Sequence, residues 1–231
     1  MRPLVALPLI FAATLLLGGP ALLAGILDRS GRAAHRVARL WGRIVLWACG
    51  VHVLVEDRSG LPTPAVYAAN HASAFDIPLL FGYLPVSFRI IHKKSLSLVP
   101  FIGWFLFLGG HVAIDRGNPF RAKRSLERAA ARIRRGTSVA VFPEGTRSRD
   151  GNVRHFKRGS FSLAMSAGMP VVPVSLVGVK AVVPQGVLSV RPGVVRLVAH
   201  PPVATAGRNA EEADVLAEEV RRAVAGACER A

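Results

Sequence analysis

A strand-like run leads directly into a short polar turn, and an apolar, helix-like run follows the turn. Residues 65–69 suit a buried strand, and the turn carries the pattern N-H-x-x-x-x-D, which begins at Asn70 and includes His71 and Asp76. Open α/β sheets present functional side chains at the carboxyl ends of their strands. This stretch therefore indicates a strand, a sharp turn and a helix of an α/β fold, with His71 at the end of the strand.

The spacing of His71 and Asp76 requires that the residues between them turn. Five positions apart on an ideal helix, the two side chains would point about 140° away from each other. Ser73 is a residue type that caps helices, and Pro78 suits a first helical turn, where its missing N–H is not needed. We therefore expect Asp76 near a helix start, where it can hold the imidazole. The alternative is an ordinary loop histidine and a capping aspartate, and the spacing alone leaves both open.

Strand and helix patterns alternate through the rest of the chain. Strand-like runs lie at residues 51–55, 111–114, 137–142, 171–177 and 194–199, and helix-like runs lie at residues 120–135, before Gly168 and after Asn209. A chain of 231 residues allows one sizeable α/β domain plus an appendage. We expect a mixed, mostly parallel sheet flanked by helices, with a membrane-associated helical segment at the N-terminus.

Three further blocks follow the first in a fixed order. They are Gly-His-Val-Ala-Ile-Asp-Arg at residues 110–116, Phe-Pro-Glu-Gly-Thr-Arg at residues 142–147, and Val-Val-Pro-Val at residues 171–174. Together with N-H-x-x-x-x-D, these blocks resemble those of the glycerolipid acyltransferase family, which contains the 1-acyl-sn-glycerol-3-phosphate acyltransferases. Four blocks in order are a strong signal, whereas H-x-x-x-x-D by itself is weak.

The resemblance implies transfer of a fatty acyl group to the sn-2 hydroxyl of 1-acyl-glycerol-3-phosphate, giving phosphatidic acid. It implies that His71 acts as the general base and that Asp76 orients it, with direct attack by the substrate hydroxyl and no acyl-enzyme. An imidazole with a pKa of about 6.5 suits that work near neutrality. The donor would be acyl-CoA or an acyl-carrier protein, used as a substrate, and no cofactor or metal is expected.

The resemblance also implies a set of residues that contact the acceptor. Arg116 and Arg147 would bind the substrate phosphate, Glu144 and Gly145 would lie near the glycerol, and Lys93 or Lys94 would contribute near the phosphate. Alone, either lysine reads as a solvated surface cation.

The block at residues 142–147 also has chemistry of its own. Gly145 lets the backbone approach a ligand, Thr146 offers a hydroxyl, and Arg147 can direct two N–H groups at phosphate oxygens. A buried Glu144 carboxylate would need a partner, so it either binds a substrate hydroxyl or fixes the loop.

Residues 3–27 contain no charged side chain and are long enough to cross a bilayer as a helix. Pro8, Gly18, Gly19 and Pro20 interrupt this run, which leaves a kinked span, two short membrane-dipping helices or a signal peptide. The run has no small-x-small cleavage site that is followed by a polar mature start, and a basic segment comes next, which favours a retained anchor. If it spans, the basic residues after it place the rest of the chain in the cytoplasm.

Residues 31–50 predict a basic amphipathic helix. Arginines recur on one face of this helix, and Trp41 and Trp47 lie among its apolar residues; the arginines are Arg32, Arg36, Arg39 and Arg43. Such a helix suits the membrane interface, with arginines toward lipid phosphates and tryptophans at headgroup depth. The alternative is a surface helix of the soluble domain. We therefore divide the chain into an N-terminal anchor with its basic helix at residues 1–50 and a catalytic domain at residues 51–231.

The charge balance favours a membrane partner. The chain has 30 Lys and Arg against 14 Asp and Glu, a net charge of +16, and is 51% hydrophobic. That combination suits an anionic membrane surface better than nucleic acid. The two cysteines, Cys49 and Cys228, lie far apart and indicate neither a disulfide framework nor a zinc site. The apolar run at residues 98–108 either lines an acyl-chain groove or belongs to the core.

Acyl transfer to lysophosphatidic acid is the first function class, and within it another lysolipid acceptor stays open, because the four blocks specify acyl transfer better than the acceptor headgroup. A hydrolase that uses the His–Asp pair is a second class, although the chain has no G-x-S-x-G elbow. A non-catalytic basic protein that binds membranes or nucleic acid is a third, but the sequence has no recognition-helix motif.

Overall fold

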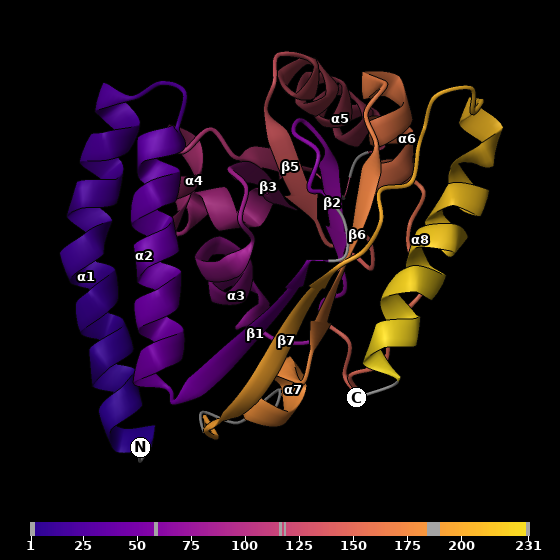
Figure 1. Ribbon diagram of the computed structural model, residues 1–231. Coiled ribbons are helices and arrows are strands. Elements are labelled where there is room, and N and C mark those ends of the chain that lie inside the picture. Colours follow the sequence, from indigo (N-terminus) through magenta and orange to yellow (C-terminus); the bar gives the residue numbers. More distant parts are fainter. Residues whose placement is uncertain (1–2, 58–59, 116, 118, 184–189, 230–231) are drawn as a thin grey trace.

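The computed structural model describes residues 3–57, 60–115, 117, 119–183 and 190–229 (Figure 1). Its centre is a seven-stranded sheet with the strand order β1-β7-β6-β2-β5-β3-β4. The strands are β1 (Val51–Asp57), β2 (Val66–Ala69), β3 (Phe88–Lys93), β4 (Val112–Ile114), β5 (Ser138–Val141), β6 (Val171–Val177) and β7 (Gly193–Ala199). The α-helices are α1 (Pro3–Leu27), α2 (Arg32–Ala48), α3 (Asp76–Tyr83), α4 (Ile102–Leu108), α5 (Pro119–Arg134), α6 (Gly159–Ala167), α7 (Val179–Val182) and α8 (Ala213–Cys228), and the 3₁₀ helices are η1 (Lys94–Leu98) and η2 (Ala210–Glu212).

Five neighbouring strands of the sheet run in one direction. β2 is parallel to both β5 and β6, and β3 is parallel to β5 and β4. β7 is antiparallel to β6, and β1 pairs parallel to β7 as the outermost strand. The mixed, mostly parallel sheet expected from the sequence is therefore confirmed. Because parallel strands end at the same side of a sheet, the segments after β2, β3, β4 and β5 all emerge at one edge.

Helices cover both faces of the sheet, as parallel strands require. The central strands β2, β5 and β6 are buried along their whole length. One face packs against α3 and α2, with Tyr67, Leu79 and Phe88 among its fully buried side chains. The other face packs against α5, α6 and α8, around residues such as Ile133 and Phe161 (Figure 1). The terminal helix α8 therefore covers this face of the sheet.

The uncharged N-terminal run is one continuous helix, α1, that contains both Pro8 and Pro20. The arrangement as two short helices is therefore not found. Residues Pro8–Leu27 are long and apolar enough to cross a membrane, by length and composition. α1 packs along α2, and α2 packs in turn on α3, so these helices form successive layers beside the sheet (Figure 1).

The arginine stripe of α2 does not face outward as a whole. The guanidinium of Arg39 donates to the carbonyls of Leu84 and Val86, at 3.0 and 3.2 Å, and Arg43 donates to the Gly82 carbonyl at 2.9 Å. These two side chains attach α2 to the end of α3. The expectation that all four arginines point toward lipid was wrong, because unpaired carbonyls after a helix end are strong acceptors for an arginine.

Candidate active site

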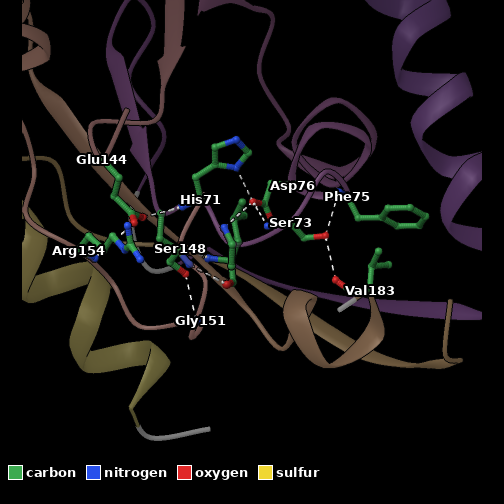
Figure 2. Close-up of polar contacts among 12 residues, drawn as sticks. His71, Ser73, Phe75, Asp76, Glu144, Ser148, Gly151, Arg154 and Val183 are labelled. Carbon is green, nitrogen blue, oxygen red and sulfur yellow. Dashed lines mark hydrogen bonds and ion pairs between the residues drawn. The ribbon is translucent and has the colours of Figure 1, made fainter. Parts of the chain in front are cut away.

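The turn between β2 and α3 brings the two ends of the first motif together. The Nδ1 atom of His71 lies 2.7 Å from Oδ2 of Asp76, and the Asp76 side chain is fully buried while that of His71 is 18% exposed. Asp76 is the first residue of α3, and Pro78 lies in its first turn. Figure 2 shows the imidazole standing above the carboxylate. The geometry matches the turn that the spacing required.

The carboxylate of Asp76 also closes the turn itself. Its Oδ2 atom accepts hydrogen bonds from the backbone N–H groups of Ala72 and Ser73, at 2.8 and 2.9 Å. Among the described residues, Oδ1 has no hydrogen-bond partner. Ser73 is not the N-cap of α3, because the hydroxyl of Ser73 accepts from the Phe75 N–H while Phe75 occupies the cap position. Oδ2 of Asp76 therefore holds the turn and the imidazole in one arrangement.

Asn70 anchors the same turn to the sheet. Its side-chain amide donates to the Leu176 carbonyl at 3.0 Å, and its carbonyl oxygen accepts from the Leu176 N–H at 2.8 Å. Asn70 is buried, and these two bonds reproduce a strand pairing where β2 has ended. Asn70 was noted only as the first letter of the motif, and its structural role depends on β6 being the neighbour of β2.

Residues after β5 complete the surroundings of His71. The ring of Phe142 stacks on the imidazole, with centroids 4.1 Å apart and planes inclined by 20°. The His71 N–H donates to Oε1 of Glu144 at 2.7 Å, and the Ser148 N–H donates to the His71 carbonyl at 2.8 Å. The segment after β5 therefore holds the backbone of His71 through Glu144 and Ser148 (Figure 2), and it holds the ring through Phe142.

Glu144 is a buried carboxylate that links two loops. Its second oxygen, Oε2, accepts from the Arg154 N–H at 3.3 Å. Burial raises the pKa of Glu144, whereas the N–H groups of His71 and Arg154 lower it, and burial dominates. Of the two roles left open for Glu144, fixing the loop is the one that these hydrogen bonds support directly.

The last three residues of the block at residues 142–147 lie nearer to solvent than Glu144. Gly145 adopts φ of +78°, a left-handed conformation that favours glycine and forms a tight turn after Pro143. Thr146 and Arg147 are exposed. Their side chains emerge at the edge of the sheet that carries His71, because β5 and β2 are parallel neighbours.

Lys93 and Lys94, at the end of β3 and directly after it, lie at this edge too, since β3 is also parallel to β5. Lys93 is exposed, and the ammonium of Lys94 lies 3.6 Å from Oδ2 of Asp115. The carboxylate of Asp115 also lies 3.7 Å from the guanidinium of Arg121. Arg116, the other candidate for the phosphate, lies outside the residues that the structure describes.

The sequence reasoning assigned no role to Phe142, Ser148 or Arg154, which position His71 and Glu144. The last two act through backbone N–H groups, so their residue types carry no signal. Phe142 is a different case, because an aromatic side chain at the end of a buried strand is a recognisable neighbour for a catalytic ring. Within the described ranges, no group of three or more His, Cys, Asp or Glu side chains could hold a metal ion.

This arrangement can move a proton. With the Asp76 carboxylate as acceptor, Nδ1 of a neutral His71 ring carries its hydrogen, and Nε2 is left with a lone pair. A partly exposed imidazole of that tautomer can take a proton from a hydroxyl as the hydroxyl attacks, and the carboxylate stabilises the imidazolium that forms.

The chain is similar to known proteins over most of its length. Residues 52–177 match the protein family described as Acyltransferase. The chain is 36% identical over 195 residues to the chloroplastic 1-acyl-sn-glycerol-3-phosphate acyltransferase LPAT1 of Arabidopsis thaliana, covering 83% of this chain and 53% of the relative. A 1-acyl-sn-glycerol-3-phosphate acyltransferase of Chlamydomonas reinhardtii is 41% identical over 192 residues, which cover 78% of this chain and 55% of that protein. The chain thus spans about half the length of these curated relatives.

A solved structure extends the likeness to the whole fold. The crystal structure of the 1-acyl-sn-glycerophosphate acyltransferase PlsC from Thermotoga maritima superposes with a TM-score of 0.82 at 32% identity, covering 98% of this chain and 94% of that one. The match includes the N-terminal helices as well as the sheet. With the motif geometry, the family match and this fold in agreement, the chain belongs to the glycerolipid acyltransferase family.

Proposed function

We propose that this protein is an O-acyltransferase that moves a fatty acyl group from a thioester to the sn-2 hydroxyl of 1-acyl-glycerol-3-phosphate, giving phosphatidic acid. The observation that carries the proposal is the 2.7 Å contact of His71 with Asp76 at the carboxyl edge of the sheet, in a chain of this family. Relatives named as 1-acyl-sn-glycerol-3-phosphate acyltransferases support the choice of acceptor.

In the proposed reaction, Nε2 of His71 removes the proton from the acceptor hydroxyl as its oxygen attacks the thioester carbonyl. A new C–O bond forms, the C–S bond breaks, and the thiolate leaves. The proton held by the imidazolium then passes to the thiolate, which restores the neutral ring. The leaving group is the thiolate of a thiol with a pKa of about 8.5, and it departs more readily than an amine would, so strong acid assistance is unnecessary. No protein nucleophile is needed, because the substrate hydroxyl takes that role.

The acceptor phosphate is assigned to cationic side chains at the same edge. Arg147 is exposed at the end of β5, and Lys93 is exposed at the end of β3. We also assign Arg116 to the phosphate, on the resemblance of its block alone. Gly145 and Thr146 would lie at the glycerol, with Glu144 holding the loop that carries them. Lys94 has a second role open to it, since its ammonium already faces Asp115.

The protein is further proposed to work at a membrane, with its catalytic domain on the cytoplasmic face. The apolar helix α1 supports membrane association. We propose a division into a membrane-associated part at residues 1–50 and a catalytic domain at residues 51–231. The two parts pack closely on each other, because α2 contacts α3.

An assay on purified protein in lipid vesicles tests the proposal. The protein is supplied with acyl-CoA or acyl-carrier protein and a panel of lysolipids, and the products are identified by mass. We expect phosphatidic acid to form, and thioester consumption to depend on added 1-acyl-glycerol-3-phosphate. Thioester consumption at the same rate without any acceptor would identify a hydrolase instead. A preference for another lysolipid would keep the reaction class and change the acceptor.

A further inference from the structure

A second uncharged segment lies on the surface between β3 and β4. From Ser95 to Gly110 the chain has no charged side chain, and this stretch forms α4 and all of η1 except its first residue, Lys94. In these two helices only Gly103 and Leu106 are buried. Large apolar side chains are therefore left in the open; they are Leu96, Leu98, Val99, Phe101, Ile102, Trp104 and Phe107, with Leu98 and Phe107 each 83% exposed. Soluble surfaces rarely carry such a contiguous set without a partner.

This segment, which we call the η1–α4 segment, is tightly folded. A Cβ atom added at Gly103 would lie 2.2 Å from the Ser97 carbonyl oxygen, so α4 folds back tightly on η1. Phe101 adopts φ of +62°, which is unfavourable for an aromatic residue, and its ring meets Trp104 edge to face at 5.1 Å. Phe101 and Trp104 therefore pack against each other where both side chains are more than half exposed.

The η1–α4 segment is continuous with the apolar surface of α1. α4 packs on α1, and a Cβ atom at Gly25 would lie only 2.8 Å from Cβ of Leu108. On α1 beside this contact, Leu23, Ile26 and Leu27 are more than half exposed. The two apolar surfaces adjoin, because α1 and α4 pack on each other. The same environment, water or lipid, therefore surrounds both.

We propose that the η1–α4 segment inserts into the interfacial layer of a phospholipid bilayer and forms a second membrane contact beside α1. α4 has 7 residues, about 10 Å of helix, against a hydrocarbon core of about 30 Å, so the segment enters one leaflet and does not cross. Trp104 has the amphipathic ring that favours headgroup depth. The basic residues Lys93 and Lys94 stand where the segment begins, toward anionic headgroups.

This placement has a consequence for the reaction. η1 starts directly after β3, at the sheet edge that carries His71. Insertion of the η1–α4 segment brings that edge to the lipid surface, where an acceptor keeps its acyl chain in the bilayer and presents its hydroxyl. The inference rests on the membrane association proposed above and adds the segment that orients the domain on the surface.

Tryptophan fluorescence with bromine-labelled lipid tests the inference without requiring turnover. In the full chain carrying Trp41→Phe and Trp47→Phe, Trp104 is the single tryptophan. The protein is placed in vesicles of phosphatidylcholine and phosphatidylglycerol, with or without bromine on the acyl chains near the headgroup. We expect bromine to quench Trp104 at least two-fold, and aqueous iodide to quench it little.

Two outcomes overturn the inference. Quenching by iodide and not by bromine places Trp104 in water. Protection from both quenchers, lost as the protein is diluted in lipid, identifies a second copy of the chain as the partner. A companion protein with Phe11→Trp as its single tryptophan, made by also changing Trp104→Phe, reports on α1. Bromine quenching at position 11 but not at Trp104 rejects the η1–α4 contact while membrane association stands; quenching at neither rejects both.

A matched pair of substitutions provides the control. Phe107→Asp in the single-Trp104 protein places a charge within the η1–α4 segment, and we expect bromine quenching of Trp104 to fall at least two-fold. Val215→Asp changes another exposed apolar residue, on α8, which covers the opposite face of the sheet (Figure 1). We expect that change to leave the quenching as it was. Equal quenching in the two proteins would contradict a lipid contact at α4.

Discussion

The His71–Asp76 turn and the cationic loop ends lie at one edge of the sheet but are built differently. In the turn, one oxygen of a fully buried carboxylate faces the imidazole and two N–H groups, and Asn70 fastens the turn to β6. At the loop ends, Arg147 and Lys93 are exposed. In the proposed reaction this difference separates two tasks: the geometry for proton transfer is set before substrate arrives, whereas the side chains that we assign to the phosphate order around a ligand.

The largest expected effect is that of His71→Ala. Loss of a positioned general base lowers kcat by about 10²–10⁴-fold. The backbone N–H of residue 71 still reaches Glu144, so we expect thermal unfolding to change little. Acyl transfer at the wild-type rate by a folded His71→Ala protein would reject the base assignment, and with it the idea that the turn sets the proton-transfer geometry before substrate arrives.

Asp76→Asn is expected to rank next in activity and to affect stability more than His71→Ala. The amide is neutral, so the imidazolium loses its stabilising charge, and we expect kcat to fall about 10²–10³-fold. Weakened bonds to the buried N–H groups of Ala72 and Ser73 cost about 1–3 kcal/mol in the free energy of unfolding. Urea denaturation measures that loss. Wild-type stability together with lost activity would show that Asp76 serves the imidazole alone and that the turn is held by other contacts.

Arg147→Ala tests the exposed cationic side chains that we assign to the substrate phosphate. A charge-assisted hydrogen bond is worth about 1.5–3 kcal/mol, so kcat/KM for 1-acyl-glycerol-3-phosphate should fall about 10- to 100-fold, mainly through KM. Stability should not change, because the side chain is exposed. Arg149→Ala, at another exposed arginine two residues further on, is the matched control and should retain wild-type KM. A destabilised Arg147→Ala protein would show that this loop end is built into the fold.

The smallest expected effect is a pH dependence due to Glu144. Its folded-state pKa lies above the ordinary value of 4.5, so ionising it costs folding free energy. The corresponding stability is complete below the unfolded pKa and is lost as pH rises through the raised folded-state pKa. Urea denaturation at pH 4 to 8 should therefore show the wild type losing stability relative to Glu144→Gln, which does not titrate. A constant difference between the two proteins across this range would contradict the prediction.

Much of the fold could be read from local patterns. The strand at residues 65–69, the turn after it and the strand at residues 171–177 are short apolar runs bounded by turn residues, so their type and order were predictable. The site pair was predictable for a similar reason, because His71 and Asp76 are close in sequence and a single turn joins them. The acceptor and donor came from resemblance rather than from the residues.

Longer-range contacts were not predictable. The direction of the Arg39 and Arg43 side chains depends on where α3 ends, and the Asn70 bonds depend on β6 lying beside β2. The apolar run at residues 98–108 was expected to line an acyl-chain groove or enter the core. The structure leaves most of it exposed, with only Gly103 and Leu106 buried in α4, so a place in the core does not hold for most of the run.

The sequence by itself determined the α/β class, the turn that joins His71 to Asp76 and the uncharged N-terminal helix, since each follows from side-chain periodicity and residue type within a few positions. Only the tertiary structure decided that β2, β3 and β5 end side by side, and that the apolar η1–α4 segment adjoins α1. Strand order and helix packing depend on contacts between residues far apart in the chain, and a local pattern carries no record of which distant partner buries it.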